Sequence, residues 1–549
     1  MKQFSKKIYA VSLGFVRILL LLLSGLLLAS GFLTTCYSTD METQLVLSKW
    51  DNPFRSLLGT ALLTLPLWGA AAYLSGGKNA AETGISETAS PGRKKHLSRR
   101  SVLRLAVLAW YMAAGLVLIL FSRSAPAADA YSVYSIAEQL AAGNTSVIHP
   151  TASYLSYYPQ QAGLAAFWEI LIRIWNLVPT DLAAYHFIKL VYLPLTCAIV
   201  FFGEKLVHEL WKDERTDCLY LLLAGLNCPL LLYSSFVYGE IPSFAALSAG
   251  LYLLTRLLME KDSASGASRP AHCAASASQA SRSAQCAASA SQVHTGKKNL
   301  SLALGSFALL TLAVLLRKNS LIFVIAAGLV LLVMGFRQKR PGLPLLAVCC
   351  LAGALAILPC VQKYYELRSG STISSGVPAL SYLAMGMQES SRAEGWYNGF
   401  NFNTYRDTGM DTRATETASR KVIEERLAYF RENPGYAAHF YLRKYLSQWT
   451  DGTYACRQAT LATLGGRSPF FVSLYEGDKS RYLISYCNIY QNVLYLGTFV
   501  FCLTACRKKR TGERGNPGPA SEDFQLPAYL GLIAALGGFL FHMAWEANS

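Results

Sequence analysis

Residues 8–33, IYAVSLGFVRILLLLLSGLLLASGFL, decide the class of this protein. A helix needs about 20 consecutive apolar residues to cross the hydrocarbon core of a bilayer, and this run contains one charged residue, Arg17. A secretory signal has a shorter apolar core of about 7–15 residues, followed by a small-residue cleavage site that is missing here. We therefore expect residues 8–33 to form an uncleaved first membrane helix.

Similar apolar runs recur along the 549 residues, of which only 15% are charged. Soluble domains typically have about 25% charged residues. We therefore expect an all-α polytopic membrane protein with about eleven transmembrane helices. The expected spans are residues 8–33, 56–74, 102–121, 182–206, 218–237, 242–258, 300–315, 320–336, 343–361, 489–505 and 526–545.

Basic residues in the loops set the expected orientation and explain the net charge of +17 without a nucleic-acid partner. They cluster at Lys2, Lys6 and Lys7, at 93–100, at 337–340 and at 507–510. All these clusters fall on the cytoplasmic side if residues 161–177, which carry Glu169 and Arg173, lie along the interface. A true crossing by 161–177 is the open alternative. We expect a multi-pass cell-membrane protein with a cytoplasmic N-terminus.

Four regions follow from these spans. Residues 1–101 form an N-terminal two-helix region with a basic cytoplasmic loop, and 102–361 form the transmembrane core. Its Ser/Ala-rich insert, 260–298, repeats CAASASQ and lacks the pattern of a packed core. Residues 362–488 form an extracytoplasmic loop with a helix expected over 415–431, either as a lid on the membrane or as a solvated loop. Residues 489–549 form the C-terminal helices.

The 13 cysteines follow no metal or disulfide pattern, since neither CxxC nor HExxH occurs. Cys36, Cys456 and Cys487 fall on the expected outer side, where they could pair. We expect no metal or other cofactor, although a divalent cation is not excluded by this pattern.

The first long outer loop contains the first candidate for chemistry. Asp129 follows the span that ends at Phe121, and an amphipathic stretch with Tyr131 and Tyr134 comes next. Partial burial raises the pKa of a carboxyl toward neutral pH and makes it a usable general base. The alternative, which composition alone favours, is a helix N-cap or a solvated loop acid.

Two further candidates lie at span ends on the same side of the membrane. Glu240 follows Tyr238-Gly239, and ionisable groups at such positions are functional candidates. Its alternative is a solvent-facing cap before Pro242. Arg317-Lys318 breaks the positive-inside bias, which suggests a lipid-phosphate site; snorkelling of both side chains to headgroups is equally compatible.

In this order along the topology, the motifs resemble GT-C membrane glycosyltransferases. The similarity is to family 39, the protein O-mannosyltransferase and aminoarabinose-transferase-like group, and to its Gram-positive bacterial branch. It covers most of the chain from the third span onward. The motifs are Asp129, Tyr158-Pro159-Gln160, Tyr238-Gly239-Glu240-Ile241-Pro242, Arg317-Lys318-Asn319-Ser320, Gly395-Trp396-Tyr397-Asn398-Gly399-Phe400 and Gln448-Trp449.

The resemblance implies a GT-C-like bundle that transfers a sugar, with inversion, from a polyprenyl-phosphate donor to a glycan, lipid or protein acceptor of the cell envelope. It implies Asp129 as general base and Glu240 as second acid, at an extracytoplasmic site. The expected substrate-binding residues are Arg317, Lys318, Tyr158, Gln161 and Tyr238. Relatives generally continue beyond the element at 541–549, so a truncated or naturally short form is expected. A flippase for lipid-linked sugars and a polysaccharide polymerase or ligase are the alternatives.

Overall fold

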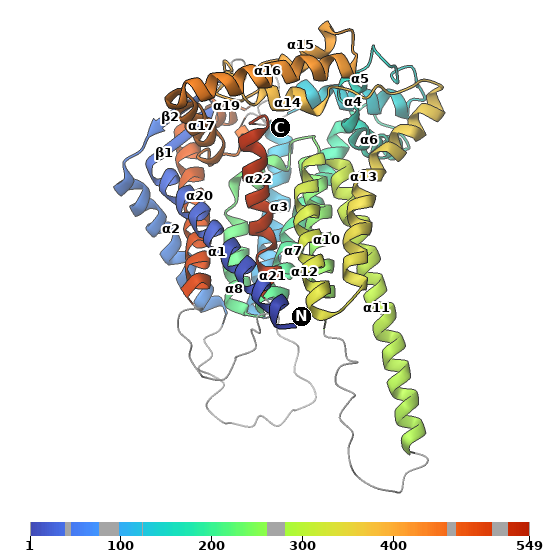
Figure 1. The fold of residues 1–549 in the computed structure, drawn as a ribbon, viewed down its shortest axis with the longest axis vertical. Helices are drawn as coiled ribbons and strands as arrows, with labels where there is room; N and C mark the ends of the chain where they lie inside the picture. The colour runs from blue at the N-terminus through green and yellow to red at the C-terminus, as the bar shows by residue number, and fades with distance from the viewer. Residues whose placement is uncertain are drawn as a thin grey trace.

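The computed structural model describes residues 2–38, 45–75, 98–122, 124–260, 280–457, 468–507 and 525–547. Within these ranges, nine helices are long and apolar enough to cross a membrane (Figure 1). They are α1 (Lys2–Leu33), α2 (Pro53–Leu74), α3 (Arg99–Ser122), α7 (Ala184–Trp211), α10 (Glu240–Met259), α11 (Ala280–Leu316), α12 (Leu321–Gln338), α13 (Gly342–Ser369) and α20 (Ser480–Arg507).

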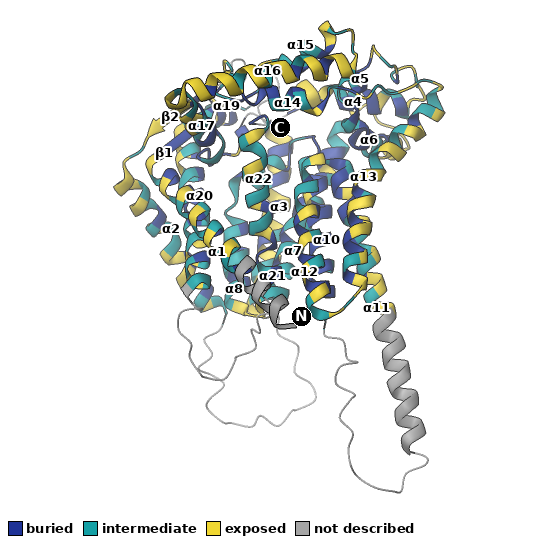
Figure 2. Ribbon diagram, viewed as in Figure 1, coloured by how far each residue is buried: buried dark blue, intermediate teal, exposed yellow. Residues whose placement is uncertain are grey.

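The helices of the bundle expose many residues on their outward faces (Figure 2), and large apolar side chains are among them, as lipid requires. On α2, Leu62 and Leu65 are 66% and 70% exposed, and on α13 Leu345 and Val348 are similarly uncovered. A water-soluble protein rarely exposes contiguous apolar surface of this kind. The inward faces of α10, α11, α12 and α13 pack into one core, with Leu254, Leu310 and Leu331 fully buried. The chain is a multi-pass membrane protein.

Two expected spans are not single long helices. The segment 218–237 contains α8 (Glu214–Gly225) and α9 (Cys228–Tyr233), because Asn227 caps α9 through a bond from the Leu230 amide and Pro229 cannot continue the preceding helix. The segment 526–545 contains α21 (Gln525–Ala528) and α22 (Leu530–Ala544), and α22 has only 15 residues. The described ranges thus contain nine long apolar helices, and the expected count of eleven is not confirmed.

Short helices form a cap layer at the end of the bundle opposite the label N (Figure 1). Between α3 and α7 lie α4 (Ala128–Ala141), α5 (Tyr154–Tyr157), η2 (Pro159–Gln161) and α6 (Ala162–Trp175). Between α13 and α20 lie α14 (Ala379–Met385), α15 (Phe400–Asp407), α16 (Thr412–Glu432), α17 (Pro434–Trp449) and α19 (Pro469–Tyr475).

The segment 161–177 lies in this layer as α6, which is too short to span a bilayer at 14 residues. Glu169, near the middle of α6, pairs with Arg173 at 2.9 Å and with Arg368 at the end of α13. The helix expected over 415–431 is α16, which ends at Asn433, and α17 then begins at Pro434.

The sequence patterns did not reveal two other elements. A β-hairpin follows α1, with β1 (Thr34–Ser38) antiparallel to β2 (Val46–Trp50) and Cys36 opposite Ser48. The helix α11 begins at Ala280, inside the Ser/Ala-rich insert, of which residues 261–279 lie outside the described ranges. The basic residues expected at 93–97 and 508–510 also lie outside them.

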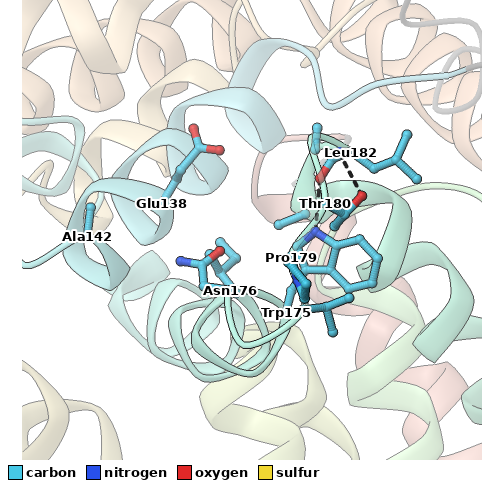
Figure 3. A pocket seen from close by; sticks show the side chains of 11 residues that line it. Glu138, Ala142, Trp175, Asn176, Pro179, Thr180 and Leu182 are labelled. Atoms are coloured by element: carbon cyan, nitrogen blue, oxygen red, sulfur yellow. Dashed lines mark hydrogen bonds between the residues drawn. The ribbon is translucent and has the colours of Figure 1, made fainter.

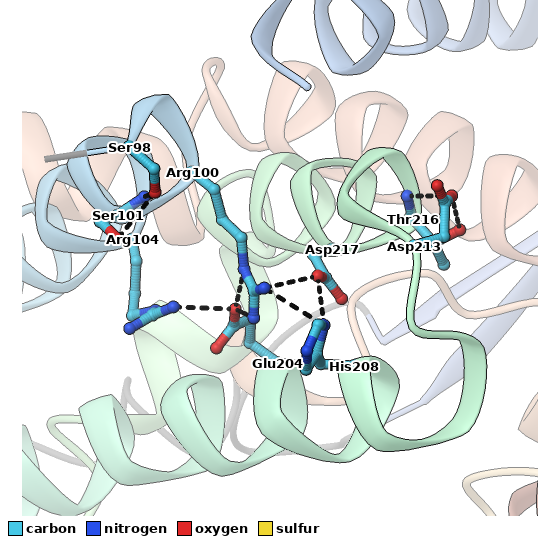
Figure 4. A network of polar contacts seen from close by, with 9 residues as sticks. All are labelled: Ser98, Arg100, Ser101, Arg104, Glu204, His208, Asp213, Thr216 and Asp217. Carbon is cyan, nitrogen blue, oxygen red and sulfur yellow. Dashed lines mark hydrogen bonds and ion pairs between the residues drawn. The ribbon is translucent and has the colours of Figure 1, made fainter. Parts of the chain in front are cut away.

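A buried ionic cluster joins α3, α7 and α8 near the end of the bundle opposite the cap layer (Figure 4). Arg100 pairs with Glu204 and lies 2.9 Å from Asp217, and Arg104 lies 3.1 Å from Glu204. Both carboxylates are fully buried, while His208 contacts Asp217 at 2.8 Å. Each charge has an opposite partner, which is the condition for placing charges among apolar helices.

We predict that Glu204→Gln destabilises the protein by about 3–5 kcal/mol, because two guanidinium groups then lose their shared carboxylate in a buried site. Unfolding by denaturant in mixed micelles measures the loss. The matched control is Glu209→Gln, which removes the pairing with Lys212 and should cost no more than about 1 kcal/mol because that lysine is exposed. Equal stability of the two variants would show that this ionic cluster does not stabilise the packing of α3, α7 and α8.

Candidate functional site

The candidate site begins where the start of α10 meets the end of α11. Gly239 lies so close to this turn that a Cβ atom there would be 2.6 Å from the Leu316 carbonyl oxygen. The approach brings the next residues of both turns together, and Arg317 Nη2 lies 3.0 Å from Glu240 Oε1. Two candidate residues, the second acid Glu240 and the substrate-binding residue Arg317, therefore form an ion pair between two helix ends.

Aromatic and amide side chains hold the Arg317 guanidinium in place. Its Cζ atom lies 4.9 Å from the centre of the Tyr238 ring, in a cation–π contact. Gln161 Nε2 donates a 2.6 Å hydrogen bond to the Tyr238 hydroxyl. The second carboxylate oxygen of Glu240 is buried and has no hydrogen-bond partner within the described residues. The Arg317 guanidinium is therefore held beside a Glu240 oxygen that could still accept a hydrogen bond.

Asp129 lies in the first turn of α4, and it is not the helix cap. The N-cap residue is Ala127, which makes no side-chain capping bond. Solvent reaches the Asp129 side chain, but surrounding protein desolvates it enough to raise the pKa of its carboxyl. A hydrogen bond with Tyr154 and the charges of Arg317 and Arg392 offset part of that rise. The carboxylate is thus accessible and close to two cations.

The structure brings most of the candidate residues together. Arg317 interacts both with Glu240 and with Asp129, so the three charged groups share one site. The Tyr158 ring packs against Tyr154 at 4.9 Å, and the Asp129 charge reaches its hydroxyl. Lys318 begins η4 (Lys318–Ser320) and its side chain is exposed.

Three site residues were not among the candidates from the sequence. Arg392 and Tyr397 come from the segment between α14 and α15, and Glu546 follows α22. All three interact electrostatically with Asp129. The motif 395–400 pointed to this segment, but no local pattern identified Arg392 or Glu546. Their roles depend on contacts between parts of the chain that lie far apart in sequence.

Cysteine and metal chemistry find no support in the described residues. Cys36 and Cys487 form no disulfide within the described residues, so the pairing considered for these two is not seen there. No group of three or more His, Cys, Asp or Glu side chains within the described ranges could hold a metal ion.

A separate hollow of about 430 Å³ lies between α4, the end of α6 and the start of α7 (Figure 3). Glu138 from α4 faces Asn176, Trp175 and Thr180 across it. Glu138 is the one titratable residue among those that line the hollow, and it accepts a 3.0 Å bond from Tyr134. This hollow therefore offers less chemistry than the site around Asp129.

Neither a protein-family model nor a curated protein matches this chain.

We predict that Gly239→Ala lowers the melting temperature of the detergent-solubilised protein, because the new methyl group collides with the Leu316 backbone and pushes Glu240 away from Arg317. Gly69→Ala is the matched control: a Cβ there meets nothing within 4 Å, and alanine favours the helix. If both variants melted at the wild-type temperature, the close approach of the two turns would not be needed for the fold.

Proposed function

We propose that this protein is a membrane glycosyltransferase that moves a sugar from a polyprenyl-phosphate donor to an acceptor on the extracytoplasmic side. The observation that carries the proposal is a solvent-accessible carboxylate, Asp129, close to the fixed guanidinium of Arg317 at one end of a membrane bundle. A lipid-linked donor would have its phosphate at that level, within reach of a cation. The family resemblance described above points to the same chemistry.

The proposed reaction uses one general base and no covalent enzyme intermediate. Asp129 takes the proton of an acceptor hydroxyl as the oxygen of that hydroxyl forms a bond to the anomeric carbon. The bond between that carbon and the phosphate oxygen breaks, and its electron pair leaves with the polyprenyl phosphate. Attack opposite the leaving group inverts the configuration. Protonated Asp129 then returns the proton to solvent.

Arg317 stabilises the phosphate in this proposal, where negative charge grows in the transition state. Glu240 and Tyr238 act as positioning residues, because they hold the guanidinium by an ion pair and a ring contact. Gln161 in turn fixes Tyr238. The exposed side chain of Lys318 fits a weaker contact with a headgroup or with the donor phosphate.

A flippase for lipid-linked sugars is the second candidate. The interruption between α8 and α9, at Leu226-Asn227, favours it, because transporters use broken helices. An assay in detergent micelles separates the two functions, since micelles have no second compartment and only an enzyme would transfer the sugar there.

We predict that Asp129→Asn abolishes transfer of radiolabelled sugar from a polyprenyl-phosphate donor while the protein still folds and inserts. General-base catalysis contributes about 10²–10⁴-fold, so a loss of that size is expected. Asp181→Asn, which changes an exposed acid in the same outer region, is the control and should keep wild-type activity. Full activity of Asp129→Asn would remove Asp129 from the mechanism.

The pH dependence follows from the raised pKa of Asp129. Desolvation disfavours its ionised form, so the active base exists only above a pKa that lies higher than the usual range for aspartate. The transfer rate should therefore rise with pH through this raised pKa. Arg317→Gln removes one of the charges that lower this pKa, so the acidic limb of kcat/KM should move to higher pH. An unchanged limb would show that Arg317 does not act on the base.

A further inference from the structure

The segment 545–547, which follows α22, is fixed into the cap layer by backbone contacts. Lys444 Nζ donates 2.6 Å hydrogen bonds to the carbonyl oxygens of Trp545 and Gly386. The Ala547 amide donates to the Gly395 carbonyl oxygen at 2.8 Å, and the Trp545 ring stacks on Tyr382 with an interplanar angle of 8°. These contacts hold the residue between them, Glu546, in one position.

The carboxyl of Glu546 lies inside the site but makes no hydrogen bond with the described side chains of the site. Its residue is 6% exposed, and among the described residues its side chain makes no hydrogen bond. Arg392 faces it, and the Arg392 guanidinium makes only a ring contact, 5.4 Å from the centre of Tyr397. A nearly buried carboxyl and a half-buried guanidinium thus interact in the site, and both can hydrogen-bond to a ligand that enters it.

Asp129 interacts electrostatically with this pair and with the Arg317 cluster. The Asp129 carboxyl feels both Arg317 and Arg392. The Arg317 guanidinium interacts electrostatically with Glu240 and Tyr238. The Arg392 guanidinium interacts in the same way with Tyr397 and Glu546. The base therefore interacts with two groups of polar side chains. The group at Arg317 suits a phosphate, and the group formed by Arg392 and Glu546 is called the second wall of the site.

We propose that Arg392 and Glu546 form the acceptor-binding wall of this site and that the acceptor is a carbohydrate, bound through its ring hydroxyls. This proposal rests on the proposed function, because it assigns the acceptor to Arg392 and Glu546 and the donor phosphate to Arg317. The proposal adds to that function a class of acceptor, carbohydrates, and two binding residues, Arg392 and Glu546.

The chemistry of the wall selects this class of acceptor. A carboxyl, a guanidinium and the phenols of Tyr158, Tyr382 and Tyr397 all hydrogen-bond to hydroxyl groups, and aromatic rings pack on the apolar faces of sugars. Burial also raises the pKa of Glu546 to about 7, so near neutral pH its carboxyl exists both as a donor and as an acceptor. An apolar alcohol would leave these groups unpaired, which sites of this kind reject strongly.

Binding of immobilised oligosaccharides tests the proposal without donor or turnover. The fluorescently tagged full chain in lipid nanodiscs is applied to an array of neutral oligosaccharides and, as the competing class, short peptides. Wild-type protein should be retained on a subset of the oligosaccharides. Retention should fall at least about 10-fold in Glu546→Gln and in Arg392→Gln, the loss expected for one or more hydrogen bonds to a charged group.

Glu425→Gln, an exposed change on α16, is the control and should bind as wild type does. Arg392→Gln guards against misfolding, because its guanidinium makes no hydrogen bond whose loss would unfold the protein. Retention on peptides alone, retention on neither class, or equal retention by wild type and both variants would overturn the proposal. If Asp129→Asn transferred sugar normally, the proposed function would fail, while loss of oligosaccharide retention in Glu546→Gln and Arg392→Gln would still support carbohydrate binding.

Discussion

The Arg317–Glu240 ion pair is the interaction on which the site depends, and it follows from the constraint that a bilayer imposes on charge. A guanidinium at the end of an apolar helix needs an opposite charge or water, because the hydrocarbon offers neither. Here the partner comes from the next helix end, and Gly239 allows the two turns to touch. The same constraint is met by Arg100 and Glu204 near the other end of the bundle. The Arg100–Glu204 cluster joins helices, whereas Arg317 also interacts electrostatically with the accessible carboxylate of Asp129.

Hydropathy predicted the class of the fold and most of the spans, because apolar length is a local property of the sequence. It did not predict the break in 218–237, where Asn227 and Pro229 divide one apolar run into two helices. It also treated 526–545 as a full span, although α22 has only 15 residues. Charge inside an apolar run, at Glu169 and Arg173, favoured an interfacial position for α6, and in the structure these two side chains pair with each other.

The site was predicted in part, for a physical reason. Asp129, Glu240 and Arg317 stand out locally, since each is a charge next to a span end, and the fold brings them together. Arg392 and Glu546 stand out only after packing, because Lys444 and Gly395 fix the segment 545–547 from distant parts of the chain. Together these residues give a carboxylate, Asp129, that interacts electrostatically with two groups of polar side chains.

A structure of the protein with polyprenyl phosphate bound tests the central claim most directly, which is that Arg317 and Asp129 face one donor phosphate. The account predicts the phosphate within about 3 Å of the Arg317 guanidinium nitrogens, on the side that faces Asp129, with the lipid tail running into the bundle surface. Phosphate bound at the Arg100 cluster, or away from both Arg317 and Asp129, would contradict it.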